Sequence, residues 1–263
     1  MKRLLSIGID RLLFQEGSAV RERILGYAKD WDEIHIIVAA DRSYKETTIG
    51  DDSPNRAGHN VWVYPTRSFA KIFYPLDARR LGKFIIKRRQ ITDITCQDPF
   101  LTAMAGVGLK REFGLPLEIQ VHTDIGSPNY PRTFANKIRK SLALSYLPRA
   151  DSIRVVSQRI KDYLTGTLKI AEQKITVRPI FVDTEKIRNA PVIASADLHK
   201  KYPQFDKIVL MASRLTVEKN IGLALNAWPA ILDKCPKAGL IIVGKGPEEK
   251  SLKALACRLG LSR

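Results

Sequence analysis

Two basic side chains flank a turn in the last fifth of the sequence. Arg214 and Lys219 stand in "SRLTVEKNIGLALNAW", between the apolar run 207–212 and a stretch with apolar residues at helical spacing. Cations beside the free N–H groups of a helix start suit a phosphate-bearing ligand, because both attract negative charge. The same composition also fits a solvated turn with ordinary surface charge, so both interpretations stay open for this segment alone.

The elements that would position this turn alternate between strand and helix along almost the whole chain. Apolar runs predict strands at 4–9, 34–39, 61–64, 91–96, 117–121, 152–156 and 175–178. Helices are predicted between them, for example from Ser18 to Asp30 and from near Pro99, where proline suits a first turn. Such alternation predicts an α/β fold with a Rossmann-type parallel sheet and helices on both faces.

A second strand–helix series begins at Lys207. Strands are predicted at 207–212 and 239–243, with helices after each, the second over 247–259. Since the stretch before it carries little periodic signal, we expect an N-terminal domain over 1–182, a linker over 183–206 and a partial C-terminal domain over 207–263. Two strands and two helices cannot cover both faces of a sheet, so the second domain is expected to be incomplete.

Basic residues are concentrated in the middle of the chain. The net charge is +17, and by our count residues 61–182 hold 21 basic and 9 acidic groups. The windows 67–90 and 132–161 each hold eight basic residues and one acidic residue. This excess predicts a polyanionic partner, either an anionic membrane, a phosphorylated substrate or nucleic acid. Nucleic acid is the least expected, because no RNA-binding aromatic signature or helix-turn-helix pattern accompanies the charge.

Cysteine and histidine usage predicts neither a disulfide framework nor a metal site. The three cysteines are far apart, and the four histidines lack metal-ligand spacing. No apolar run approaches the roughly 18 residues of a membrane span, and the apolar run at the N-terminus is too short for a signal peptide. We therefore expect a cytoplasmic location, with at most peripheral attachment to the inner membrane face, and no cofactor. A dehydrogenase is disfavoured because Gly8-Ile-Asp10 does not continue as a GxGxxG fingerprint.

The ordered set of motifs resembles the retaining glycosyltransferases of the GT-B fold, specifically family 4, the "group 1" transferases. The strongest pieces are "ASRLTVEKNIGLALNAW" and "LIIVGKGPEEKSLKALACRLGL", which follow the family's strand, R-x4-K turn, helix, strand and G-x-G-P order. Supporting pieces are "CQDPFLTAMAG", "IQVHTD", "RADSIRVVSQRIKDYL" and "ITVRPIFVDTEKI". The resemblance implies two Rossmann-type domains, and it covers the first of them and the start of the second.

The resemblance also implies roles for individual residues. Arg214 and Lys219 match the family's cations that neutralise the diphosphate of a nucleotide-sugar donor, without a divalent metal. His122, in "IQVHTD", matches a family histidine near the reacting sugar, although an imidazole satisfied within a strand-end turn would look the same. Gly17 is the best match to the glycines that admit donor phosphates after the first strand, in a loop that is otherwise poor in glycine.

Three further positions are weaker matches. Gly244 and Gly246 in "VGKGPE" fit a tight turn near the nucleotide, a pattern that is also common in ordinary turns. Asp124 fits a residue that binds acceptor hydroxyls, and equally an exposed loop aspartate without that role. The absence of a paired-carboxylate site does not count against the family, because its leaving phosphate is thought to accept the acceptor's proton.

The sequence departs from the family pattern in two places. The usual Pro-Asn-Gly-Val-Asp link reads Pro-Ile-Phe-Val-Asp at 179–183, which predicts a repositioned hinge. The family's E-x7-E pair, which holds the donor sugar and ribose, would lie beyond residue 263. We therefore expect a donor site that is unfinished in this chain, with a partner chain as one source of the missing half.

The window 132–161 contains a basic amphipathic pattern. Phe134, Ile138 and Leu142 recur every four residues beside Lys137, Arg139 and Lys140. Related transferases with lipid-linked acceptors dock such surfaces on anionic headgroups, and the pattern fits that role. Packing of the stripe on the sheet, with solvated cations, is the equally open alternative.

The function implied is transfer of a hexose-type sugar, with retention, from a nucleotide-sugar donor to a lipid-linked or polysaccharide acceptor of the cell envelope. Two alternatives remain at this level. A nucleotide-sugar epimerase would share the fold, but its catalytic carboxylates are not apparent. A non-catalytic or split accessory subunit at the membrane surface would explain the missing half without requiring turnover by this chain.

Overall fold

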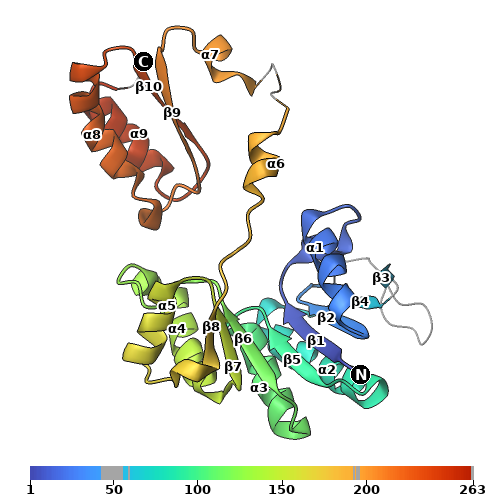
Figure 1. Ribbon diagram of the computed structural model, residues 1–263. Coiled ribbons are helices and arrows are strands. Elements are labelled where there is room, and N and C mark those ends of the chain that lie inside the picture. The colour runs from blue at the N-terminus through green and yellow to red at the C-terminus, as the bar shows by residue number, and fades with distance from the viewer. Residues whose placement is uncertain (43–55, 59, 192, 194–195, 262–263) are drawn as a thin grey trace. The chain divides into compact units, whose positions relative to one another are not determined.

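The computed structural model describes residues 1–42, 56–58, 60–191, 193 and 196–261 (Figure 1). Its backbone divides into two compact units, Met1–Ile180 and Phe181–Arg263. Part of the linker expected over 183–206 lies outside the described residues.

Unit 1 is built on one twisted sheet. Its strands run β3-β4-β2-β1-β5-β6-β7-β8 across the sheet, and all neighbours are parallel except β3 with β4. Their bounds are β1 Arg3–Gly8, β2 Glu33–Val38, β3 Arg56–Gly58, β4 Val61–Pro65, β5 Asp93–Cys96, β6 Leu117–Val121, β7 Ser152–Val155 and β8 Ile175–Val177. The predicted parallel sheet is confirmed, and β3 adds an antiparallel edge strand that no apolar run announced.

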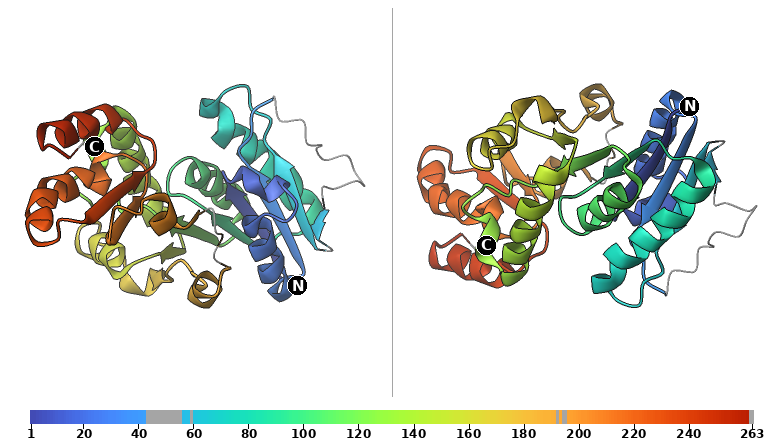
Figure 2. Two further views of the ribbon diagram at one scale, coloured as in Figure 1. Left: turned by 90° about the horizontal axis from the view of Figure 1, so that it is seen from above. Right: turned by 90° about the horizontal axis from the view of Figure 1, so that it is seen from below.

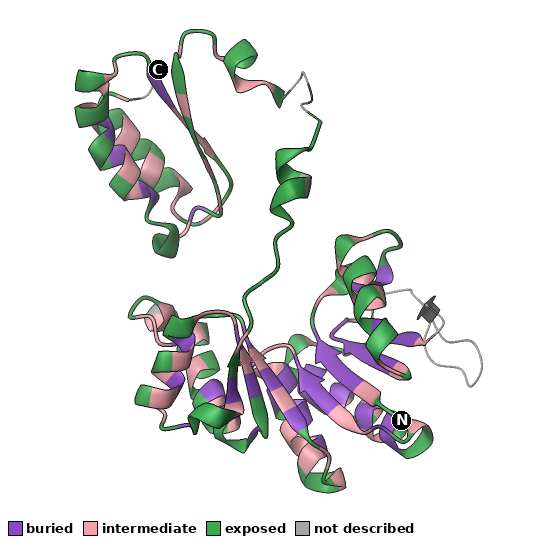
Figure 3. Ribbon diagram, viewed as in Figure 1, coloured by how far each residue is buried: buried purple, intermediate pink, exposed green. Residues whose placement is uncertain are grey.

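Apolar side chains alternate between two cores, one on each face of this sheet. Leu5 and Ile7 of β1 pack in a cluster with apolar side chains of α2 Tyr74–Arg89, α3 Leu101–Phe113, α4 Phe134–Tyr146 and α5 Gln158–Gly166. Ile34 and Ile36 of β2 pack instead with side chains of α1 Ala19–Tyr27. Helices therefore lie on both faces, with α1 on one and α2 to α5 on the other (Figures 1 and 2). Figure 3 shows the buried positions following the strands of unit 1.

Helix starts and stops in unit 1 follow local capping chemistry. Ser18 caps α1 by accepting the N–H of Arg21, and Ser157 caps α5 by accepting that of Ile160. α3 begins at Leu101, so Pro99 precedes the helix instead of lying in its first turn. The reason is Asp98, whose carboxylate accepts the N–H groups of Phe100 and Thr102 and fixes the helix start after the proline.

Unit 2 contains a smaller parallel sheet. It pairs β9 Lys207–Ala212 with β10 Ala238–Val243 in register, and α8 Ile221–Lys234 connects the two strands. α9 Glu249–Arg258 follows β10 and contacts α8, while α6 Thr184–Arg188 and α7 Leu198–Lys201 precede β9. The helix predicted after Lys219 continues through Pro229 to Lys234. Within the described part of the chain, no helix is long and apolar enough to cross a membrane.

Candidate functional site

Arg214 and Lys219 lie in the loop that joins β9 to α8. The loop leaves the carboxyl end of β9, passes through the short 3-10 turn Val217–Lys219 and enters α8 at Ile221. Asn220, between Lys219 and the helix, has a left-handed backbone (φ 48°) and makes no side-chain cap hydrogen bond. The first turn of α8 therefore has no side-chain cap, and Lys219 stands directly before it.

A second loop, at the carboxyl end of β10, is hydrogen-bonded to the first. Ser213 N–H donates to Val243 O (3.0 Å), Leu215 N–H to Lys245 O (3.0 Å) and Glu248 N–H to Leu215 O (3.1 Å). These bonds extend the pairing of β9 and β10 past the ends of both strands. They hold Arg214 beside the segment Gly244–Gly246.

The two glycines of this segment permit that close approach. A Cβ on Gly244 would lie 1.8 Å from Ser213 O, and one on Gly246 would lie 2.2 Å from Leu215 O. Gly244 also has φ +151°, which side-chain-bearing residues rarely adopt. The structure thus gives both glycines a packing role. It also brings a third cation, the exposed Lys245, into the loop pair, which the sequence signal for a G-x-G turn did not single out.

The carboxylate of Glu218 borders Arg214 and Lys219. Glu218 Oε1 lies 3.7 Å from Arg214 Nη2, and the two side chains are 53% and 76% exposed. Hydrogen bonds from its own backbone N–H and from Thr216 hold the pKa of Glu218 below its usual value, and Arg214 and Lys219 add to this. Glu218 is therefore ionised at neutral pH and partly offsets the charge of Arg214.

In unit 1, His122 stands at the carboxyl end of β6. Its Nε2 lies 3.3 Å from Gln120 Oε1, which also accepts a hydrogen bond from Arg154 Nη1 (3.4 Å). Since an amide oxygen only accepts, this pairing places the proton of a neutral imidazole on Nε2. Burial, followed by the charges of Arg154 and Arg23, lowers the pKa of His122 against the opposing effect of Asp98. His122 is therefore a neutral imidazole at pH 7. Gln120, two residues earlier on the same face of the strand, is the positioning partner that the motif "IQVHTD" contained but that sequence reasoning missed.

Asp124 and Gly17 lie in two other loops of unit 1. Asp124 accepts the N–H of Gly126 (3.1 Å) and pairs with Arg159 (2.7 Å), so its carboxylate already has two partners. Gly17 has φ +70° and open space around its Cα, and it directly precedes the cap residue of α1. Between Gly17 and β1, the loop folds as the 3-10 turn Arg11–Phe14, with Leu13 and Phe14 buried.

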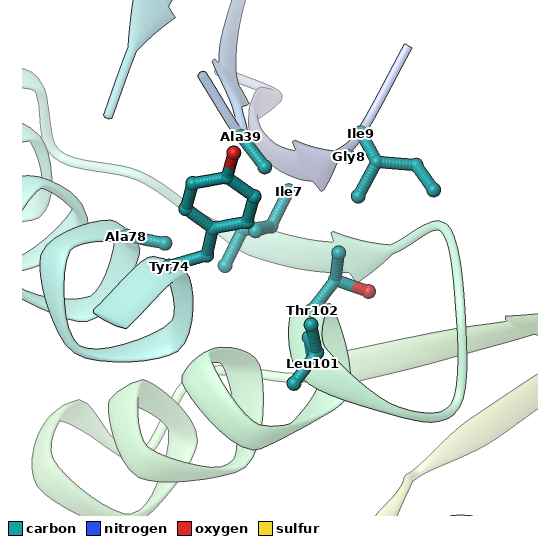
Figure 4. Close-up of a pocket in the computed structure, with 8 residues that line it drawn as sticks. All are labelled: Ile7, Gly8, Ile9, Ala39, Tyr74, Ala78, Leu101 and Thr102. Atoms are coloured by element: carbon teal, nitrogen blue, oxygen red, sulfur yellow. The ribbon is translucent and has the colours of Figure 1, made fainter. Parts of the chain in front are cut away.

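A small, mostly apolar pocket lies where β1 ends in unit 1. Gly8 and Ile9 line it together with Tyr74 of α2 and with Leu101 and Thr102 at the start of α3 (Figure 4). Arg11 Nη2 donates to Tyr74 Oη (3.1 Å) and pairs with Asp41 (3.1 Å). The carboxyl end of a parallel sheet is where α/β folds bind ligands, so this pocket is a candidate substrate contact. No motif in the sequence pointed to Tyr74.

The expected apolar stripe of α4 is only partly buried. Phe134 is 78% exposed and Ile138 is 47% exposed, while Leu142 is half-buried. Lys137 and Arg139 are exposed beside them, and Lys140 Nζ lies 5.6 Å from the ring centre of Tyr163. The alternative prediction, that the whole stripe packs on the sheet, is therefore wrong for Phe134 and Ile138.

Among the described residues, no group of three or more His, Cys, Asp or Glu side chains could hold a metal ion.

Comparison with known proteins identifies the family of both units. Residues 20–186 match the model of Glycosyltransferase Family 4, and residues 196–263 match that of Glycosyl transferases group 1. An alpha-monoglucosyldiacylglycerol synthase of Streptococcus pneumoniae is 26% identical over 184 residues, which are 66% of this chain and 41% of that protein. The chain spans between 41% and 57% of the length of the curated relatives it matches.

Solved structures show the GT-B fold. Sucrose-phosphate synthase from Thermosynechococcus elongatus superposes with a TM-score of 0.67 at 17% identity, covering 100% of this chain and 69% of that one. Anabaena HepE in complex with UDP gives 0.63 at 18% identity, over 99% and 67% of the two chains. The UDP-GlcNAc 2-epimerase of Methanocaldococcus jannaschii gives 0.51 at 13%, over 99% and 69%. With its parallel sheets, its paired loops and a matching model over more than half its length, the chain belongs to glycosyltransferase family 4.

Proposed function

We propose that the chain acts in the transfer of a hexose-type sugar, with retention, from a nucleotide-sugar donor to a lipid-linked or polysaccharide acceptor. The observation that carries the proposal is the loop pair of unit 2: Arg214 and Lys245 stand on two hydrogen-bonded loops, and Lys219 lies directly before the start of α8. Fixed cations and helix N–H groups are the partners that a diphosphate needs, and the relative solved with UDP supports a nucleotide ligand.

The chemistry assigned to this loop pair is stabilisation of the leaving group. As the bond between the anomeric carbon and the phosphate oxygen breaks, negative charge grows on the β-phosphate, where Arg214 and Lys219 act without a metal ion. The acceptor oxygen forms its bond to the anomeric carbon on the same face, and its proton passes to the departing phosphate. Gly244 and Gly246 act indirectly, because they allow the loops to approach.

Unit 1 is assigned the sugar and acceptor contacts. With its Nε2–H held by Gln120, the neutral His122 would accept a hydrogen bond from a sugar hydroxyl at Nδ1. Asp124 is proposed to meet acceptor hydroxyls, for which it must exchange its contact with Arg159. Gly17 is proposed to admit donor phosphates, supported by its positive φ and the open space around it.

We further propose that the acceptor is associated with the membrane. The protein would then lie peripherally on the cytoplasmic side of the inner membrane. The exposed Phe134 and Ile138 beside Lys137, Arg139 and Lys140 support docking of α4 on anionic lipid. The pneumococcal relative is named as a synthase of a glucosylated diacylglycerol, and this name supports a lipid acceptor for the present chain. The epimerase alternative is supported only by similarity of fold.

A partner chain that completes the donor side is proposed for unit 2. Most of β9 is solvent-exposed, including the apolar Val209 (48%) and Leu210 (51%), although parallel strands are normally covered on both faces. A non-catalytic or split subunit would use the same surface.

The direct test is transfer of labelled sugar. The chain would be incubated with UDP-, GDP- and ADP-sugars and with acceptors that include diacylglycerol and membrane lipid extract, and products would be analysed by chromatography and by NMR of the anomeric centre. We expect an α-linked product from an α-linked donor. Nucleotide binding without transfer would support the split-subunit alternative, and inverted product would contradict the proposed mechanism.

A further inference from the structure

A run of large apolar side chains is exposed where α2 begins. Phe69 is 74% exposed, Ile72 77%, Phe73 43% and Leu76 57%. Ile72 and Phe73 lie four and three residues before Leu76, which places them on its side of the path formed by the 3-10 turn Lys71–Phe73 and α2. Phe69 lies in the bend just before that turn. Phe84 (38% exposed) lies two turns further along the same side.

The backbone around these side chains is held by buried polar contacts. Ser68 is fully buried, and its N–H donates to Ala40 O (2.9 Å). Phe73 N–H donates to Ala70 O (3.0 Å), and the next residue, Tyr74, is buried in the pocket and bonded to Arg11. The exposed apolar side chains are therefore presented by an anchored segment.

Cations alternate with the apolar side chains on this surface. Lys71, Arg80 and Lys87 are exposed, and none of them makes an ion pair with a carboxylate among the described residues. The guanidinium of Arg88 lies 4.1 Å from the ring centre of Phe84. The helix side next to α3 differs, because Arg79 and Lys83 there both pair with Glu112 (3.0 and 2.8 Å).

We propose that this face, the α2 surface, docks on an anionic lipid bilayer. The α2 surface consists of the apolar residues Phe69, Ile72, Phe73, Leu76 and Phe84 and the basic residues Lys71, Arg80 and Lys87. Unpaired cations match the phosphate headgroups, and the apolar side chains reach the acyl boundary between them. A second copy of the chain fits poorly, because two-fold pairing would bring the same cations of both copies together. Nucleic acid fits less well, because the most exposed apolar side chain of this face, Ile72 (77%), and its neighbour Leu76 cannot stack on bases, although the phenylalanines could.

The α2 surface adjoins the pocket at the end of β1. Tyr74 lies between Phe73 and Leu76 in sequence and turns its ring into that pocket (Figure 4). Docking through this surface would place the carboxyl end of β1, with this small pocket, near the edge of the bilayer. This inference rests on the proposed function, because it explains how a lipid acceptor would be reached, but it does not require that α4 docks on the membrane. Binding to vesicles can be measured without sugar transfer.

The test measures partition of the full chain onto phosphatidylcholine vesicles with and without phosphatidylglycerol. We compare the double variant Ile72→Gln/Leu76→Gln with Leu223→Gln, a control in α8 that changes the same side chain at similar exposure (64%). Ile138→Gln tests α4. The expected result is binding to the anionic vesicles only, about tenfold weaker in the double variant and unchanged in Leu223→Gln. Circular dichroism confirms that each variant is folded.

A second readout follows insertion. In Ile72→Trp, the new indole should be quenched by brominated acyl chains, which binding by charge alone would not produce. The proposal is overturned if the wild type ignores anionic vesicles, if the double variant binds as well as the wild type, or if only Ile138→Gln loses binding. Nucleoside diphosphate binding, measured on the wild type, the double variant and Ile138→Gln, should be the same in all three. If the wild type binds no nucleotide but the α2 surface still directs vesicle binding, the failure belongs to the proposed function alone.

Discussion

At the scale of single residues, the balance between cations and one carboxylate governs the candidate diphosphate site. Arg214 lies 3.7 Å from Glu218, and the exposure of both side chains makes that pair weak. A diphosphate would therefore displace Glu218 at little cost, but would still feel its negative charge.

Replacing this carboxylate should tighten nucleotide binding. Glu218→Gln removes one negative charge beside Arg214 and Lys219 while keeping the shape of the side chain. We expect the Kd for UDP to fall about two- to fivefold at low salt, with a smaller change at high salt because the effect is screened. Isothermal titration calorimetry measures it, with Asp233→Asn near the end of α8 as the control. Weaker binding in Glu218→Gln would show that Glu218 itself contacts the ligand.

The buried His35 makes unit 1 sensitive to acid. Its ring is fully buried, stacks on Trp62 with ring centres 4.7 Å apart, and lies between Tyr64 Oη (2.8 Å) and Glu33 Oε2 (3.0 Å). Burial lowers its pKa despite the hydrogen bond to Glu33. The unfolded chain therefore takes up a proton on this residue at a higher pH than the folded chain.

Stability should consequently fall as the pH drops below about 6.5, the ordinary histidine value, toward the lower folded value. Urea unfolding at about pH 7 and about pH 5 should show a smaller loss in His35→Phe than in the wild type, whatever the variant costs at neutral pH. The exposed His199→Phe serves as a control that should retain the wild-type loss. Equal losses in all three proteins would contradict the assignment.

At the scale of elements, the paired loops after β9 and β10 depend on two glycines. Gly244→Ala would place a Cβ 1.8 Å from Ser213 O at a φ of +151°, so the loops must separate. We expect a loss of at least about 2 kcal/mol in the stability of unit 2, together with weaker nucleotide binding. Gly222→Ala is the matched control, since its Cβ would meet nothing closer than 3.7 Å and helix propensity favours alanine. Thermal denaturation followed by circular dichroism would compare them, and equal stability of Gly244→Ala and wild type would contradict this role.

The same elements show how far sequence patterns reach. Strands such as 117–121 and 207–212 were predicted to the residue. In the first, apolar residues alternate with Glu118 and Gln120, which matches its alternating burial, and the second is apolar from Ile208 onward. The edge strand β3 and the helix start after Pro99 were missed, since they depend on pairing with β4 and on the carboxylate of Asp98. The residues of the candidate site likewise include some that the sequence identified and some that it did not. Family spacing selected Arg214, Lys219 and His122. Gln120 emerges from its hydrogen bond with His122, two residues further on, whereas Lys245 and Tyr74 emerge from contacts between elements far apart in sequence.

At the scale of the whole molecule, the two units differ in how much apolar surface they bury. Unit 1 has two cores that cover both sides of β1 and β2. The buried apolar side chains described in unit 2 are Leu215, Ile221, Leu225, Trp228 and Ala238, and most of β9 is exposed. Burial is the main favourable term in folding, so unit 2 is expected to be the less stable unit.

Urea unfolding should therefore proceed in two steps. Trp228 reports on unit 2, whereas Trp31 and Trp62 report on unit 1. We expect a first fluorescence transition that disappears in Trp228→Phe and a second one that remains. A single transition that coincides in both proteins would mean that the units unfold as one cooperative body.

The central claim is that the loop pair of unit 2 binds a nucleoside diphosphate, and calorimetric titration with UDP, GDP and ADP tests it most directly. The wild type would be compared with Arg214→Ala, Lys219→Ala and the control Lys234→Ala, which removes a cation at the far end of α8. We predict saturable binding of one nucleotide, at least about tenfold weaker in the first two variants and unchanged in the control. Binding that survives in both Arg214→Ala and Lys219→Ala, or is lost equally in Lys234→Ala, would contradict the assignment of this loop pair as the diphosphate site.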